Sequence, residues 1–84
     1  MMNILVCDDE IEIVEAIEIY LRNESYNVIK AYDGIEAINA LEKNVVQLII
    51  MDVMMPRMDG LRAVMRIREV SNIPVIMLSA KTED

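Results

Sequence analysis

The amino-acid sequence predicts an α/β fold built on an open parallel sheet. Short apolar runs alternate with stretches whose apolar residues recur at helical spacing, in the order β-α-β-α-β-α-β. The apolar runs are continuous, which is typical of parallel strands covered on both faces. With 84 residues and no linker or internal repeat, the chain is expected to form one small domain spanning residues 1–84.

Four segments have the length and composition of strands. Residues 4–7, 48–51 and 75–78 are apolar runs that are too short for helices. Residues 27–32, with the sequence NVIKAY, are more polar, so this strand is expected at an edge of the sheet. Pro74 precedes the last strand, a position where its missing N–H does least harm.

The first two helices follow from apolar periodicity and from end signals. The first is expected over about residues 10–23, with Asn23 as its C-cap. The second begins at Asp33, and Glu36 three residues later completes a capping box. Lys43 lies in its last turn, where the helix dipole favours a cation.

The third helix is predicted after a loop that follows the third strand. It begins near Asp59 and Gly60, and its apolar stripe is expected to contain Leu61, Val64 and Ile67. The amphipathic pattern ends before the last strand.

Composition excludes several functional classes. A net charge of −7 argues against a nucleic-acid surface, which needs clustered Lys and Arg, and favours a cation site or a basic partner. The single cysteine, Cys7, and the absence of histidine exclude an internal disulfide and every His-based site. Cys7 is expected to be a small core residue in a reducing compartment. No apolar run is long enough to cross a membrane and no signal peptide is seen, so a soluble, cytoplasmic chain is expected.

Polar residues follow three of the predicted strands. Asp8 and Asp9 follow the first strand, Asp52 follows the third and Ser79 follows the fourth. Ligands of open α/β sheets bind outside the carboxyl ends of the strands, so these side chains converge if the three strands are neighbours. Clustered carboxylates repel one another unless a cation is present. Mg²⁺ is the expected cation, because it takes oxygen ligands and keeps waters that a phosphate can displace.

Plain structural roles compete with this interpretation. Asp9 followed by Glu12 is itself a capping box, so these acids could simply start the first helix, and one carboxylate could serve both purposes. Ser79 alone is compatible with an ordinary turn. Asp52 is harder to explain structurally, because it directly follows a strand and no cap pattern comes at once after it.

Three motifs in order resemble a known family: ILVCDDE, LIIMDVMMPRMDG and IPVIMLSAK. Together they resemble the receiver domain of two-component response regulators, close to the N-terminal domain of winged-helix OmpR/PhoB-type transcription regulators. The resemblance covers essentially the whole chain. It implies a flavodoxin-like (CheY-like) fold with strand order 2-1-3-4-5, and a phosphoacceptor signalling domain rather than an enzyme.

The resemblance also implies a role for each matching residue. Asp52 would accept a phosphoryl group from a sensor histidine kinase and form an acyl phosphate. Asp9 would ligate Mg²⁺ directly, Asp8 would help to hold it through water, and the backbone carbonyl of Met54 would supply a further ligand. Ser79 would hydrogen-bond the phosphoryl group and report its arrival.

Further positions match the family in the loop after the third strand. Pro56 and Gly60 would shape this loop, and Asp59 would cap the next helix. Phosphorylation would switch a separate output domain, expected to bind DNA, whereas this part of the protein would bind none.

A complete receiver continues through a fourth helix, a fifth strand and a fifth helix. This chain is therefore expected to be a truncated receiver that lacks the family's phosphate-contacting lysine and aromatic switch residue, and Lys81 is not expected to replace that lysine. Mg²⁺ binding is expected to be weak and phosphorylation impaired. A fourth strand left at a bare edge also predicts self-association, by edge pairing or exchange of elements.

Two alternatives come from other functional classes. A Mg²⁺-dependent phosphohydrolase of the haloacid-dehalogenase type also uses an aspartate after a strand, but generally places a second Asp two residues later, where this chain has Met54. The other alternative is an interaction module without chemistry.

Overall fold

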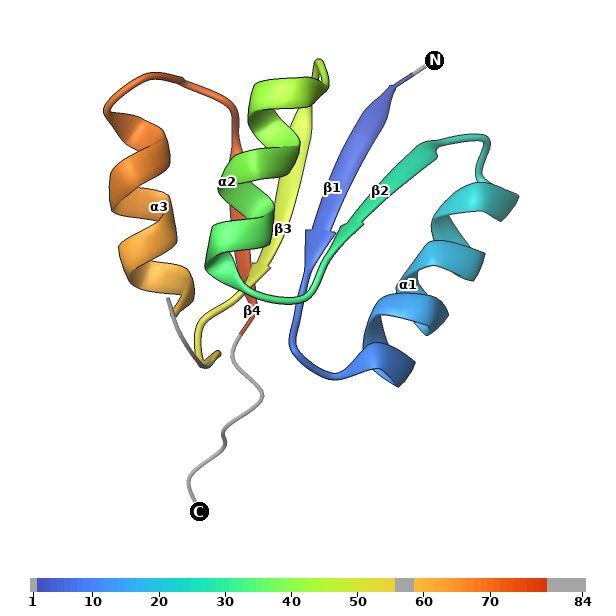
Figure 1. The fold of residues 1–84 in the computed structure, drawn as a ribbon. Coiled ribbons are helices and arrows are strands. Elements are labelled where there is room, and N and C mark those ends of the chain that lie inside the picture. Colours follow the sequence, from blue (N-terminus) through green and yellow to red (C-terminus); the bar gives the residue numbers. More distant parts are fainter. Residues whose placement is uncertain (1, 56–58, 79–84) are drawn as a thin grey trace.

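The chain folds into a four-stranded parallel sheet with helices on both faces (Figure 1). The computed structural model describes residues 2–55 and 59–78. The strands are β1 (Asn3–Cys7), β2 (Asn27–Ala31), β3 (Leu48–Asp52) and β4 (Val75–Leu78). The helices are α1 (Ile11–Asn23), α2 (Gly34–Lys43) and α3 (Gly60–Arg68).

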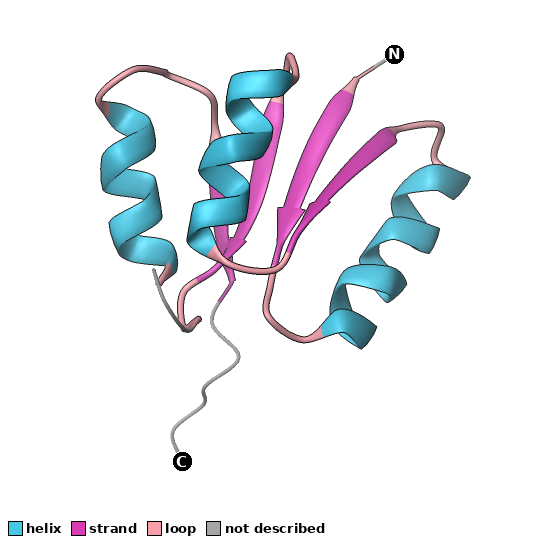
Figure 2. Ribbon diagram, viewed as in Figure 1, coloured by secondary structure: helices cyan, strands magenta, loops and turns pink. Residues whose placement is uncertain are grey.

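The strands lie in the order β2-β1-β3-β4, and every neighbouring pair is parallel (Figure 2). The predicted order of the first four strands is confirmed, as is the edge position of β2. The register pairs Cys7 of β1 with Met51 of β3. The residues that follow these two therefore leave the sheet at the same edge, and this is what positions the site.

Two apolar clusters, one on each face of the sheet, form the core. Ile4 and Val6 of β1 belong to the cluster that contains Val14 of α1. Leu5 and Cys7, which alternate with them, belong to the cluster under α2 and α3. All five are almost completely buried. Burying one large aliphatic side chain stabilises a fold by about 1.5–3 kcal/mol, so the central strand accounts for much of the stability.

The two predicted capping boxes have different outcomes. At α2 the predicted cap is confirmed, because the Asp33 carboxylate accepts a hydrogen bond from the Glu36 backbone N–H at 2.9 Å. The Glu36 carboxylate reaches back to accept from the Tyr32 N–H at 2.8 Å, one residue before the N-cap. At α1 the prediction of an Asp9–Glu12 box is wrong. The N-cap of α1 is Glu10, which makes no side-chain cap hydrogen bond. Instead the Glu10 N–H donates to Asp8 Oδ1 at 2.9 Å, so the chain makes a turn before the helix starts.

The C-terminal end of α1 is closed by a backbone motif. The C-cap is Glu24 rather than Asn23, which is the last helical residue. The Tyr26 N–H donates to the Leu21 carbonyl and the Ser25 N–H donates to the Arg22 carbonyl, the two bonds of a Schellman motif. This motif places Ser25 at φ 72°, the left-handed conformation that favours glycine.

The apolar stripe of α3 differs from the predicted one. Ala63 and Ile67 are buried, whereas Leu61 is 60% exposed. The prediction that Leu61 faces the core is therefore wrong. The helix packs through its smallest side chains, Gly60 and Ala63, and so lies close to the sheet at its N-terminal end.

β4 lies at the edge of the sheet in the part of the chain that the structure describes. Ile76 and Met77 of this strand are exposed. The predicted self-association through this edge stays a prediction. Among residues 2–55 and 59–78, no helix is long and apolar enough to span a bilayer.

We expect Ser25→Gly to raise the free energy of unfolding by about 1 kcal/mol, because glycine adopts a left-handed conformation without the steric cost of a Cβ. Urea denaturation measures the change. Ser25→Val should lower stability, since a β-branched side chain tolerates positive φ poorly. Equal stabilities for the two variants would mean that Ser25 is not held in this conformation in solution.

Candidate functional site

Three carboxylates meet at the carboxyl edge of the sheet. Asp8 and Asp9 follow β1, and Asp52 is the last residue of β3, the strand paired with β1. One oxygen of each carboxylate lies within 4.8 Å of the oxygens of the other two. The convergence expected from neighbouring strands is therefore present for these three residues.

The three acids differ in their exposure. Asp8 and Asp52 are only 5% and 6% exposed, while Asp9 is open to solvent. The Met54 backbone N–H donates to Asp52 Oδ1 at 3.4 Å, and the Glu10 N–H donates to Asp8 Oδ1. These backbone contacts hold both buried carboxylates at the edge of the sheet without neutralising their charges.

The electrostatics of this cluster are unfavourable without a counter-ion. The pKa of Asp8 is raised above its ordinary value, first because burial disfavours the charged form, and then because Asp52 and Asp9 lie close by. The hydrogen bond from Glu10 partly opposes this rise. Folding thus brings the negative charges of the carboxylates together, and a bound cation would relieve the repulsion between them.

The donor set suits Mg²⁺. All three candidate ligands are carboxylates, the hard oxygen donors that this ion takes. With one oxygen of each carboxylate within 4.8 Å of the other two, Asp8, Asp9 and Asp52 are the residues that would hold such an ion. The exposure of Asp9 leaves an open side where waters or a phosphate could complete the coordination.

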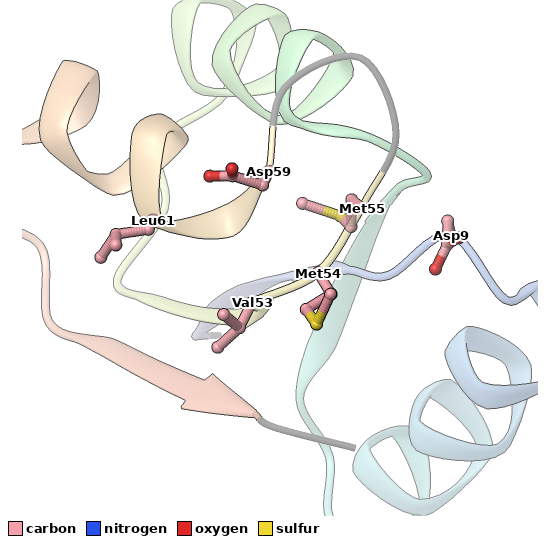
Figure 3. A pocket seen from close by; sticks show the side chains of 6 residues that line it. All are labelled: Asp9, Val53, Met54, Met55, Asp59 and Leu61. Carbon is pink, nitrogen blue, oxygen red and sulfur yellow. The ribbon is translucent and has the colours of Figure 1, made fainter. Parts of the chain in front are cut away.

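A cleft of about 430 Å³ lies beside the acids. The residues that line it, labelled in Figure 3, come from three segments: the loop after β1, the loop after β3 and the first turn of α3. The lining residues are Asp9, Val53, Met54, Met55, Asp59 and Leu61. An acidic group therefore opens into a cleft with mostly apolar walls, large enough for a phosphoryl group and part of its donor.

The predicted site residues outside the cluster are placed as follows. The Met54 side chain is 62% exposed at the cleft, while its backbone contacts Asp52. Ser79, Pro56 and Lys81 lie outside the described residues. Asp59 is the N-cap of α3, as predicted, and accepts a hydrogen bond from the Arg62 N–H at 2.9 Å.

Gly60 supports the site through close backbone packing. Its N–H donates to the Val53 carbonyl at 2.9 Å. A Cβ at this position would overlap the backbone carbonyl oxygen of Asp52. The N-terminal end of α3 is therefore packed directly against the strand end that carries Asp52. The family resemblance implied that Gly60 shapes the loop, but not this contact with the Asp52 backbone.

Sequence reasoning missed the sulfur groups beneath the site. Cys7 is buried, as predicted, and its Sγ lies 3.3 Å from the Asp33 carbonyl oxygen and 3.5 Å from Met55 Sδ. Burial, followed by the nearby charges of Asp33 and Asp8, raises the pKa of the thiol from 9.0 to about 12. The thiol stays neutral, so it adds no charge below the acids. The only sequence signal for sulfur beneath the acids was the position of Cys7 directly before Asp8.

Comparison with known proteins gives a consistent result. Residues 4–84 match the response regulator receiver domain family. The response regulator GtcR of Aneurinibacillus migulanus is 46% identical over 81 residues, which is 96% of this chain and 34% of that protein. The transcriptional regulatory protein CpxR homolog of Haemophilus influenzae is 40% identical over 84 residues, 100% of this chain and 37% of that protein. The chain thus spans about a third of the length of these relatives.

Solved structures show the same likeness. The response regulator TrrA of Thermotoga maritima, in complex with Mg²⁺ and BeF, superposes with a TM-score of 0.90 at 34% identity, covering 95% of this chain and 70% of that one. TrrA has also been solved in complex with the histidine kinase ThkA, and that copy superposes with a TM-score of 0.91 at 33% identity, covering 99% and 72%.

Asp8→Asn should stabilise the chain at neutral pH in buffer that contains a metal chelator. The pKa of Asp8 is raised on folding from its ordinary value of 3.8. At a pH between these two values, the folded state therefore holds a proton that the unfolded state has lost. This carboxyl's contribution to stability therefore falls as pH rises from that value through the raised pKa. Asparagine keeps the acceptor for the Glu10 N–H but carries no charge.

Urea denaturation across this acid range measures the effect as the difference between wild type and Asp8→Asn. Asp59→Asn is the matched control, because asparagine also caps helices. Identical pH dependence of wild-type and Asp8→Asn stability would contradict a raised pKa of Asp8 in the folded chain, and with it the burial and charge crowding described above.

Gly60→Ala should lower the free energy of unfolding by about 1–3 kcal/mol, the usual range for overpacking. Helix propensity alone predicts the opposite sign, a gain of up to about 1 kcal/mol. Asn39→Ala, at an exposed position of α2, serves as the control and should be neutral or stabilising. Unchanged or higher stability of Gly60→Ala in urea denaturation would show that the contact with Asp52 is looser than described.

Proposed function

The chain belongs to the receiver domain family of two-component response regulators, and on that premise we propose that Asp52 accepts a phosphoryl group at an Mg²⁺ site formed with Asp8 and Asp9. One observation carries this proposal: the buried carboxylate that ends β3 and the two acids that follow the neighbouring strand β1 converge within 4.8 Å beside an open cleft. The expected role is that of a phosphoacceptor that switches other parts of a protein, not of an enzyme with turnover.

The metal would be held by Asp8, Asp9 and Asp52, with the backbone carbonyl of Met54 as a further ligand. When bound, Mg²⁺ would offset the charge of the carboxylates and of the phosphoryl oxygens. The role of Asp52 is to attack phosphorus as the bond to the leaving group breaks, which requires an in-line approach. The Met54 N–H orients its carboxylate, and the contact of Gly60 with the Asp52 backbone holds the strand end.

A sensor histidine kinase is the proposed phosphoryl donor. Support comes from the complex of TrrA with the histidine kinase ThkA, since TrrA is 33% identical to this chain. Such a receiver would work in the cytoplasm. A DNA-binding output is proposed from the relatives named as transcriptional regulatory proteins, of which the chain spans about a third. The proposed role of Ser79 as the phosphoryl contact, and self-association of this chain, remain to be tested.

The test of the proposed function is intact-mass spectrometry after incubation with acetyl phosphate and Mg²⁺. Wild type should gain the mass of one phosphoryl group, and Asp52→Asn should gain none, because an amide is not a comparable nucleophile. Asp59→Asn is the matched control: it removes another acid of the same cleft, keeps the helix cap, and should still be phosphorylated.

Phosphorylation of Asp52→Asn, or phosphorylation of wild type that persists when Mg²⁺ is chelated, would contradict the assignment. A chain extended by a fifth strand and its flanking helices, as in a complete receiver, should be run in parallel. If only the extended chain is labelled, the assignment of Asp52 stands and the reaction depends on the added segment.

A further inference from the structure

Helix α3 exposes a face that extends away from the proposed phosphoacceptor site, with only Leu61 of this face bordering the cleft. Leu61 and Met65 are 60% and 65% exposed, and Arg62 and Arg66 are exposed beside them. Residues at these spacings lie together on one side of a helix. We call these four residues the α3 face. A hollow of about 200 Å³, lined by Arg62, Met65, Arg66 and Glu69, marks part of it.

The charge of this helix is opposite to that of the chain. The sequence carries a net charge of −7, yet α3 contains three arginines and no acid. Arg66 reaches Glu69 only at 4.0 Å, and both side chains are well exposed. Such a pair is worth little in water, so the guanidinium groups of the α3 face remain available to another partner.

We propose that the α3 face docks an acidic, amphipathic segment of a partner protein. Leu61 and Met65 would contact apolar side chains of that segment, and methionine adapts well to varied apolar surfaces. Arg62 and Arg66 would pair with its carboxylates, for which the planar guanidinium suits bidentate contacts. Nucleic acid fits less well, because its binding depends on many clustered Lys and Arg, whereas the α3 face offers two arginines beside two exposed apolar side chains.

A second copy of this chain is the less suitable occupant. Helix α1 does present acids together with the exposed Ile19 and Tyr20. However, α1 and α3 cover opposite faces of the sheet (Figure 1). A contact of α1 on one copy with α3 on another would therefore be head-to-tail, and such contacts propagate as open filaments unless the rotation happens to close.

The test is a titration of the ¹⁵N-labelled chain with a synthetic helical peptide, followed by NMR. The peptide has about 15 residues, with leucines at i, i+3, i+4 and i+7 and glutamates flanking them. We expect shifts confined to amides of α3, and binding that weakens as salt is raised. Replacing the glutamates by lysines should abolish binding, and replacing the leucines by serines should weaken it.

Two charge reversals locate the surface. Arg66→Glu should weaken binding roughly fivefold to tenfold, since it removes an ion pair and adds a like charge. Arg22→Glu is the matched control, because Arg22 is also a helical arginine paired with a glutamate but lies on α1, and it should leave binding unchanged. Circular dichroism checks that both variants keep their helices.

Three results would overturn the proposal. The first is the absence of α3 shifts with the acidic peptide, and the second is equal affinity of wild type and Arg66→Glu. The third is a set of α3 shifts that grow with protein concentration when no peptide is present, which would assign this face to a second copy of the chain. The test does not involve phosphorylation, so its outcome is independent of the role of Asp52.

Discussion

The parallel pairing of β1 with β3 is the constraint on which the site depends. Its register places Cys7 beside Met51, so the acids that follow β1 and the acid that ends β3 reach the same edge of the sheet. Two of these carboxylates are almost fully buried, and this burial, followed by the nearby charges of Asp52 and Asp9, raises the pKa of Asp8. The pairing that stabilises the sheet therefore also creates a local repulsion that a bound cation would remove.

The core beneath the site adds no charge to this cluster of acids. β1 is buried on both faces, with Ile4 and Val6 toward α1 and Leu5 and Cys7 toward α2 and α3. The soft side chain of Met55 meets the Cys7 thiol, whose pKa of about 12 keeps it neutral near the acids. Negative charge is thus concentrated in groups at the edge of the sheet, while the layer immediately below is uncharged and well packed.

Helix α3 links this edge to the surface of the molecule. Its first residue, Gly60, packs on the Asp52 backbone, and the next residue, Leu61, lines the cleft beside the acids. Leu61 also belongs to the exposed face with Met65 and the arginines. A single short helix therefore contacts both the strand end that carries Asp52 and the solvent. The first turn of α3 packs on the Asp52 backbone through Gly60 and carries Leu61 in the wall of the cleft. A shift of α3 would therefore move that wall.

Local sequence patterns determined several parts of this protein. The apolar runs predicted the strands, Asp33 and Glu36 predicted the start of α2, and the acids after two strands indicated where a cation site would lie. These features depend on side-chain period and on hydrogen bonds between residues a few positions apart, which a sequence displays directly. The family resemblance added the order of the strands and the proposed roles of Asp52 and Asp9.

Long-range packing decided the rest. Asp9 looked like part of a helix cap, but the turn bonded to Asp8 moves the start of α1 to Ile11. Leu61 has the spacing of a core residue, yet it is exposed because α3 approaches the sheet through Gly60 and Ala63. Convergence of the three carboxylates requires β1 and β3 to be neighbours, and no local pattern states which strands pair. The sequence alone determined which residues could form the site, and the tertiary structure decided which of them meet, because only the pairing of distant strands brings their side chains within reach of one ion.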